Sequence, residues 1–134
     1  MKYSVDKNTP EDTTIIQQDF FISSGLAGAP ALHLHLNLNT ADSTFNGSAH
    51  ITQATNPPPQ FTSMVSGKYI TILEQATPVE IFTGVGNLLN TPIYENLDFS
   101  FELGDGNLAR FKYRTSMTSE WVVIEDARVE TVRK

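Results

Sequence analysis

The chain has 134 residues, of which 40% are hydrophobic, 18% are charged and none is cysteine, and its formal net charge at pH 7 is −6. This length and composition predict one globular domain with a single core rather than a disordered chain. The acidic balance argues against nucleic acid as a partner because phosphate binding needs a basic surface, and the absence of cysteine excludes disulfides and thiolate zinc sites.

The first residues are polar and carry no apolar run of the kind found in secretory signals. Residues 1–12 contain Pro10 and three acidic residues, so we expect a loose N-terminal arm before a single domain over 13–134. No stretch approaches the roughly 20 apolar residues of a spanning helix. We therefore expect a cytoplasmic protein without a membrane partner.

The first predicted strand, residues 13–23, is rich in Ile, Phe and Thr. Residues 24–30 contain two glycines and a proline and predict a loop. From Leu32 to Leu38 leucine occupies every second position, which is the period of a strand with one buried face.

The next segment repeats this period and predicts a hairpin whose register can be derived. Pairing Leu38 with Phe45 and Leu32 with Ile51 keeps both apolar sets on one face, and a slip of one residue would separate them. The turn then falls at residues 40–43.

The middle of the chain is less regular. Residues 54–60 include three consecutive prolines, which cannot donate ladder hydrogen bonds, so we expect the sheet to break there in a polyproline II crossing. A long strand is predicted over 61–73, where Gly67 indicates a bulge or bend. A shorter strand over 79–85 leads into a loop with the sequence GVGNLLNTP.

The C-terminal part predicts two further hairpins. Residues 97–103 alternate cleanly, a Gly-Asp-Gly turn follows, and pairing Phe99 with Phe111 keeps one face apolar. A second turn pairs Phe111 with Ile124. Residues 129–132 predict at most a short last strand.

The whole pattern predicts an all-β fold. No segment of ten or more residues has a helical period. We expect a single antiparallel β-barrel of about eight strands, since closure removes exposed strand edges. A two-sheet β-sandwich is the alternative, and the proline break suits it slightly better. The bulky apolar residues are enough to fill an eight-stranded barrel, which favours a packed interior.

Two overlapping stretches, GAPALHLHLNLNTADSTFNG and NGSAHITQATNPPPQFTSMVSGKYITI, carry a resemblance. A strand of alternating leucine, a short turn, an Asn-Gly pair and an ITQA-NPP run resemble a small family of uncharacterised bacterial all-β domains, each a domain of unknown function. The resemblance covers about half of the chain. It implies a bacterial origin and a compact all-β domain, and it implies no activity, cofactor or catalytic residue.

The derived hairpin register places all three histidines on one face, with His33 opposite His50 and His35 opposite Ser48. Imidazoles on opposite residues have Cβ atoms about 4.5–5.5 Å apart, which suits two ligands of one zinc ion. The face could equally be a solvated polar surface, or a pH-responsive pair of imidazoles. The neighbours expected around the histidines supply no carboxylate to orient them: Asn37, Asn46, Ser48 and Thr52.

Trp121 is the second candidate. The register of the last hairpin places it on the outer face near Arg114, where the two could stack and anchor a partner. If the register were shifted by one residue, Trp121 would instead belong to the core.

A basic row is the third candidate, because Arg110, Lys112 and Arg114 alternate along one strand. The derived registers place Asp98 and Glu125 beside them. The row is therefore either a set of solvated ion pairs or an anion-binding stripe.

No catalytic motif is present: neither Gly-rich loop matches a dinucleotide or P-loop pattern, and no G-x-S-x-G occurs. We therefore expect no enzymatic activity and no cofactor. The favoured function is a binding or accessory module that presents loops or an outer sheet face to a protein or small ligand. The alternative is a metal-binding domain that holds zinc weakly at His33, His35 and His50. The oligomeric state stays open.

Overall fold

The computed structural model describes residues 14–54, 61–73, 78–88, 95–104 and 106–132. The expected loose arm over 1–12 and the three consecutive prolines lie outside the described residues. Within the described residues, no helix is long and apolar enough to cross a membrane.

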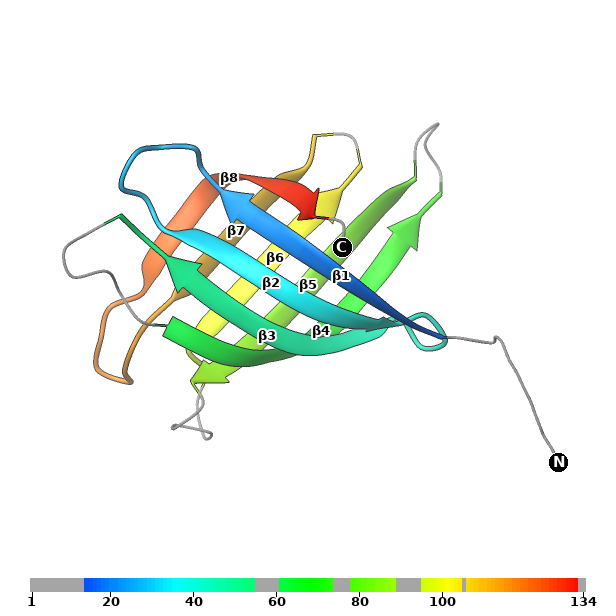
Figure 1. Cartoon of the computed structure of the whole chain (residues 1–134), viewed down its shortest axis with the longest axis horizontal. Coiled ribbons are helices and arrows are strands. Elements are labelled where there is room, and N and C mark those ends of the chain that lie inside the picture. The colour runs from blue at the N-terminus through cyan, green and yellow to red at the C-terminus, as the bar shows by residue number, and fades with distance from the viewer. Residues whose placement is uncertain (1–13, 55–60, 74–77, 89–94, 105, 133–134) are drawn as a thin grey trace, which may run out of the picture.

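The chain folds into a closed antiparallel barrel in which each strand pairs with its neighbours in chain order (Figure 1). The last strand returns to the first, with Ile22 opposite Val129, so the single barrel is confirmed and the two-sheet sandwich is wrong. The strands are β1 (Ile15–Ser23), β2 (Ala31–Asn39), β3 (Thr44–Thr52), β4 (Phe61–Ile72), β5 (Val79–Leu88), β6 (Leu97–Leu103), β7 (Leu108–Tyr113) and β8 (Val122–Val132).

The predicted hairpin registers are confirmed. In β2 and β3, Leu38 lies opposite Phe45 and Leu32 opposite Ile51, with residues 40–43 as the turn. In β6 and β7, Phe99 lies opposite Phe111, as predicted. Alternation of apolar and polar residues thus fixed the register, because only one pairing keeps each apolar set inside.

Two strands are longer than predicted. β5 continues to Leu88, through the segment that was expected to be a loop, because Gly84 and Gly86 pair with both β4 and β6. Glycine has no side chain, so these two residues leave no trace in the pattern of apolar residues. β8 is a full strand over Val122–Val132 rather than a short one. A bulge opposite the segment from Ala109 to Phe111 shifts the pairing of β8 with β7. This shift interrupts the apolar alternation along β8, so the sequence pattern did not show the full length of the strand.

Gly67 does not mark a bulge, since β4 pairs without a register shift with both β3 and β5. A Cβ atom at this position would collide with the backbone oxygen of Thr83 and would lie 2.6 Å from Cζ of Phe45. Glycine is needed here because neighbouring backbone and an aromatic ring occupy the space of a side chain.

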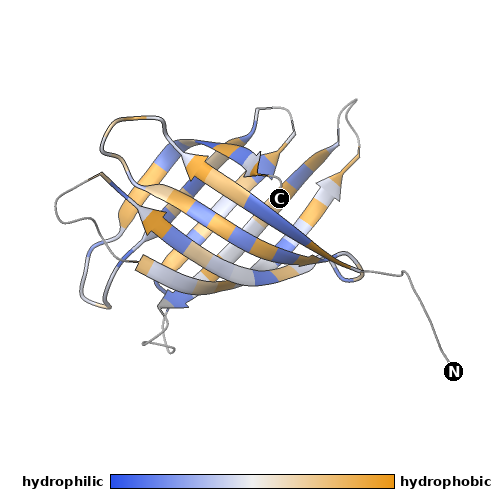
Figure 2. Cartoon of the chain, in the orientation of Figure 1, coloured by the Kyte–Doolittle hydropathy of each residue, from blue (hydrophilic) through white to orange (hydrophobic). Residues whose placement is uncertain are grey.

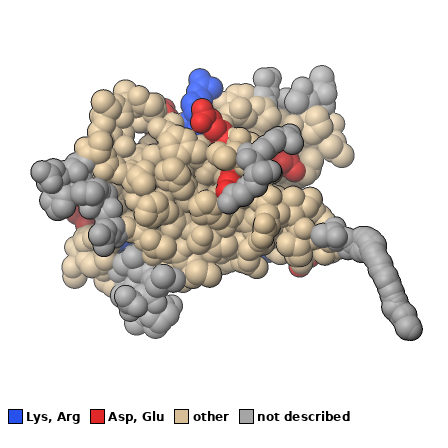
Figure 3. Space-filling view, viewed as in Figure 1, with Lys and Arg blue, Asp and Glu red and all other residues tan. Residues whose placement is uncertain are grey.

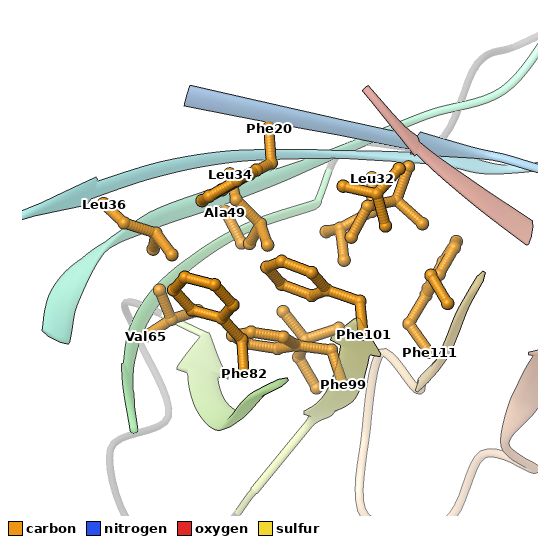
Figure 4. Packing of buried hydrophobic residues seen from close by; sticks show 14 of the residues in the cluster. Phe20, Leu32, Leu34, Leu36, Ala49, Val65, Phe82, Phe99, Phe101 and Phe111 are labelled. Carbon is orange, nitrogen blue, oxygen red and sulfur yellow. The ribbon is translucent and has the colours of Figure 1, made fainter. Parts of the chain in front are cut away.

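Apolar side chains alternate along the strands (Figure 2) and meet inside the barrel, where Phe side chains dominate (Figure 4). The rings of Phe82 and Phe101 stack with centroids 4.7 Å apart, and Phe20 packs against both at 5.3 and 5.0 Å. These three side chains are each at most 2% exposed. The barrel is therefore held by a packed aromatic core, and the outer face and the ends are the surfaces left for function.

Candidate functional site on the outer face of the barrel

The three histidines share the outer face of β2 and β3, as the sequence predicts. His33 lies directly opposite His50, with ring centroids 6.1 Å apart, and His35 lies opposite Ser48. Phe21 of β1 packs edge-on against His33 with centroids 4.7 Å apart. The pairing register of the hairpin thus brings the histidines together on one face.

Asp19 is the residue beside the histidines that the sequence pattern did not reveal. It lies on β1 opposite His35, and its Oδ1 is 3.1 Å from Nδ1 of His35. The expectation that no carboxylate reaches the histidines is therefore wrong. The pairing of β1 with β2 would have predicted this contact, since a register with Ile22 opposite Leu32 places Asp19 beside His35.

Each imidazole has a different polar partner. Nε2 of His33 lies 3.3 Å from Oγ1 of Thr52, and Nδ1 of His50 lies 3.5 Å from Oγ1 of Thr62. Among the described residues, no group of three or more His, Cys, Asp or Glu side chains is arranged to hold a metal ion. The geometry gives the proposed three-histidine zinc site no support.

The environment of His33 disfavours its charged form. Burial lowers the pKa of His33 below its ordinary value of 6.5, and the nearby charges of His50 and His35 lower it further. His33 is therefore neutral over a wider pH range than a free histidine, because burial disfavours the charged imidazole and a second positive charge close by is unfavourable.

Trp121 lies on the outer face, next to the basic row. Its ring centroid is 4.7 Å from Nζ of Lys112 and 4.6 Å from Cζ of Arg114. The predicted pairing of Tyr113 with Val122 is present, so Trp121 is not part of the core. Both cations lie within the roughly 6 Å over which an aromatic ring attracts a positive charge.

Backbone contacts fix Arg114 at the end of β7. Its amide donates to the carbonyl of Asn96 at 2.9 Å, and its Nη2 donates to the carbonyl of Glu95 at 3.4 Å. Arg114 thus ties the segment before β6 to the segment before β8, with Trp121 against its guanidinium. The predicted pair thus lies in the connection between β7 and β8, and Arg114 is tied there to the segment before β6.

A shallow groove of about 250 Å³ runs along the outer face of β6, β7 and β8. The bulge in the β7 and β8 pairing lies at the same place, where Arg110 stands between the paired positions Ala109 and Phe111. Bulges are frequent beside binding sites because they redirect side chains. The groove is lined mainly by polar and charged side chains: Asp98, Ser100, Arg110, Lys112 and Glu125.

The basic row is only partly neutralised by its neighbours. Nζ of Lys112 lies 3.8 Å from Oδ2 of Asp98, and both side chains are close to half exposed. Such an exposed ion pair contributes at most about 1 kcal/mol and is readily exchanged for another carboxylate. The contact between Lys112 and Asp98 agrees with the ion-paired interpretation of the row, and anion binding stays a prediction.

The connections between strands differ at the two ends of the barrel. The strands β1, β3, β5 and β7 end on the left of Figure 1, and each is followed by more residues before the next strand than the strands that end on the other side. Trp121 and Arg114 lie at this end, in the connection between β7 and β8 or at its border. Long loops gathered on a rigid scaffold are a frequent place for binding residues.

Comparison with known proteins identifies a family but no function. The family model described as "Domain of unknown function (DUF1842)" matches residues 15–121, which confirms the resemblance to a family of uncharacterised domains. No curated protein matches the chain.

Proposed function

The chain belongs to the DUF1842 family, whose description assigns no activity, and from its geometry we propose that it is a non-catalytic binding module. The binding surface is the outer face of β6, β7 and β8 with Trp121 at one end. The ligand is an acidic segment of a partner protein. One observation carries this proposal: Trp121 is held against both Lys112 and Arg114, beside a groove that continues along the basic row.

The spacing of the basic row supports an extended ligand. Arg110 and Lys112 occupy alternate positions of β7 and project from the same face about 6–7 Å apart, and Arg114 continues the spacing one residue beyond the end of the strand. An extended peptide has the same repeat, and carboxylates at every second residue would face the three cations in turn. Each new pair would replace weak existing contacts such as that between Lys112 and Asp98.

Trp121 adds an apolar contact surface that the basic row alone does not provide. Surface tryptophans that remain partly accessible are frequent anchors at protein interfaces, because a large ring offers contact area at a small entropic cost. Its position against Arg114 also holds the guanidinium in one place, so that less freedom is lost on binding. We therefore expect contacts from both an acidic and an apolar side chain of the ligand.

The experiment is a binding titration of fluorescein-labelled hexaglutamate by fluorescence anisotropy at low salt. We expect saturable binding that weakens as salt is added, because the interaction is largely electrostatic. Hexalysine with the same label should not bind. Absence of hexaglutamate binding at low salt would refute the proposal.

Matched variants distinguish binding at this surface from a general effect of the net charge. Arg114→Gln should weaken hexaglutamate binding by about fivefold, the loss expected for one exposed ion pair. Lys68→Gln removes the same charge from an exposed position on β4, outside the groove, and should leave the affinity unchanged. If both variants weakened binding equally, only the net charge would matter and the site assignment would be wrong.

A further inference from the structure

The opposite side of the barrel carries a second groove, on the outer face of β1 to β4. Three rows of outward side chains cross these strands in register, and the middle row contains Asp19, His35, Ser48 and Met64. The flanking rows contain Phe21, His33, His50 and Thr62 on one side, and Gln17, Asn37, Asn46 and Ser66 on the other.

The groove follows the middle row and the flanking row that contains Gln17 and Asn37. Its volume is about 390 Å³, at the lower end of the range of small-molecule sites, and Asp19, His35, Asn37 and Ser48 line it. Asp19 is only 9% exposed although it lies on the outer face. The groove therefore combines a largely buried carboxylate, which already faces His35, with hydrogen-bonding side chains around it.

We propose that this groove binds a neutral, polyhydroxylated ligand, namely an oligosaccharide. The amide of Asn37 donates to Oδ1 of Asn46 at 3.2 Å, which orients both amides and leaves each with further donor or acceptor capacity. Nδ1 of His35 is 3.1 Å from Asp19, which directs the other ring nitrogen away from β1. Donors and acceptors thus alternate over a short distance, and sugar hydroxyls, which are both, can satisfy them.

The charge of this face selects against the other ligand classes. Its three rows contain no Lys or Arg, and Asp19 is their one acidic residue. In Figure 3, uncharged side chains predominate among the described residues on this face of the molecule. Among the described residues of these rows, phosphates and acidic peptides would find no Lys or Arg, which distinguishes this groove from the β6 to β8 surface.

An apolar contact completes the site. Met64 lines the groove and is 56% exposed, so its thioether is available to the carbon face of a sugar ring. Met64 lies between the polar residues Thr62 and Ser66 on the outward face of β4 and has no partner in the core. Polar hydrogen bonding around one apolar contact is the general pattern of small-ligand sites.

The test is titration of the ¹⁵N-labelled protein with maltohexaose and, separately, cellohexaose, followed by amide chemical shifts. We expect saturable shifts for at least one of the two, concentrated at β1 to β3 and centred on Asn37 and Ser48. The indole signal of Trp121 should not move, and the anionic trigalacturonate should bind more weakly. Absence of saturable shifts with both neutral sugars, or shifts centred elsewhere, would overturn the proposal.

Variants make the test specific. Asn37→Ala should weaken the binding by about tenfold, the loss expected for one or two hydrogen bonds. Thr83→Ala changes an exposed polar residue of β5 outside the groove and should bind like the parent. Unchanged affinity of the Asn37→Ala protein, with its amide spectrum otherwise preserved, would also overturn the proposal.

Discussion

The rings of Phe45 and Phe99 lie with centroids 5.9 Å apart although they belong to β3 and β6, which are separated by two strands. The residues between them in register are Gly67 and Gly84, which pair with each other. A Cβ atom at Gly84 would contact both rings, at 2.7 Å from Cζ of Phe45. The two glycines thus make the space that the two rings fill.

This arrangement predicts that Gly67→Ala is destabilising. The new methyl group would collide with the backbone oxygen of Thr83 and with the ring of Phe45, so strand or ring must shift. Overpacking of this kind costs about 1–3 kcal/mol. Urea unfolding of Gly67→Ala beside Ser66→Ala, an exposed neighbour, measures the difference, and equal stability of the two variants would contradict the prediction.

Phe82 should be among the most sensitive core positions. It is 0% exposed and packs against Tyr69 at 5.1 Å as well as Phe101 at 4.7 Å. Phe82→Ala should lower the free energy of unfolding by about 3–5 kcal/mol, since the barrel cannot close around the cavity without moving several strands. Thermal and urea unfolding measure this, with Ile70→Ala, at a 58% exposed position on β4, as the control. A loss of under about 1 kcal/mol for Phe82→Ala would mean that its surroundings collapse freely.

The depressed pKa of His33 predicts a pH dependence of stability. The unfolded chain binds a proton near pH 6.5, whereas the folded protein does so only at lower pH, because of burial and of the charges on His50 and His35. Protonation therefore favours the unfolded chain. The penalty is absent well above pH 6.5, grows as the pH falls below this value and levels off below the folded pKa.

Urea midpoints of the parent and of His33→Gln between pH 5 and pH 8 isolate this effect. The parent should lose more stability than the variant as the pH falls through this range. An NMR titration of the His33 ring should give a pKa below 6.5 in the folded protein. Parallel stability curves for the two proteins would show that His33 does not contribute.

The sequence predicts much of the fold because its hairpins alternate strictly. In β2 and β3 the pairing of Leu38 with Phe45 is the one that buries both apolar sets, and the structure has it. β8 was underestimated because the bulge beside Phe111 shifts its alternation and because small Ala127 fills a core position there. β5 was underestimated because glycine gives no hydropathy signal where it makes room for a ring.

Each candidate site could be predicted only as well as the pairing register of the strands that form it. The contact of His33 with His50, and that of Trp121 with Arg114, follow from hairpins of strands that are consecutive in the chain. The contact of Asp19 with His35 depends on β1, where Phe20 and Phe21 are adjacent, so that hydropathy alone does not say which of them faces the core. Asp19 could be placed only once the neighbouring strands were known.

The most direct test of the proposed binding function is the fluorescence of Trp121, which is the single tryptophan of the chain. Its ring lies 4.6 Å from the guanidinium carbon of Arg114, so an acidic ligand that draws Arg114 and Lys112 toward its carboxylates changes the environment of the indole. Titration with unlabelled hexaglutamate should give a saturable change in Trp121 emission with the same midpoint as the anisotropy titration. Saturable hexaglutamate binding without any change in Trp121 emission would contradict the assignment of this surface.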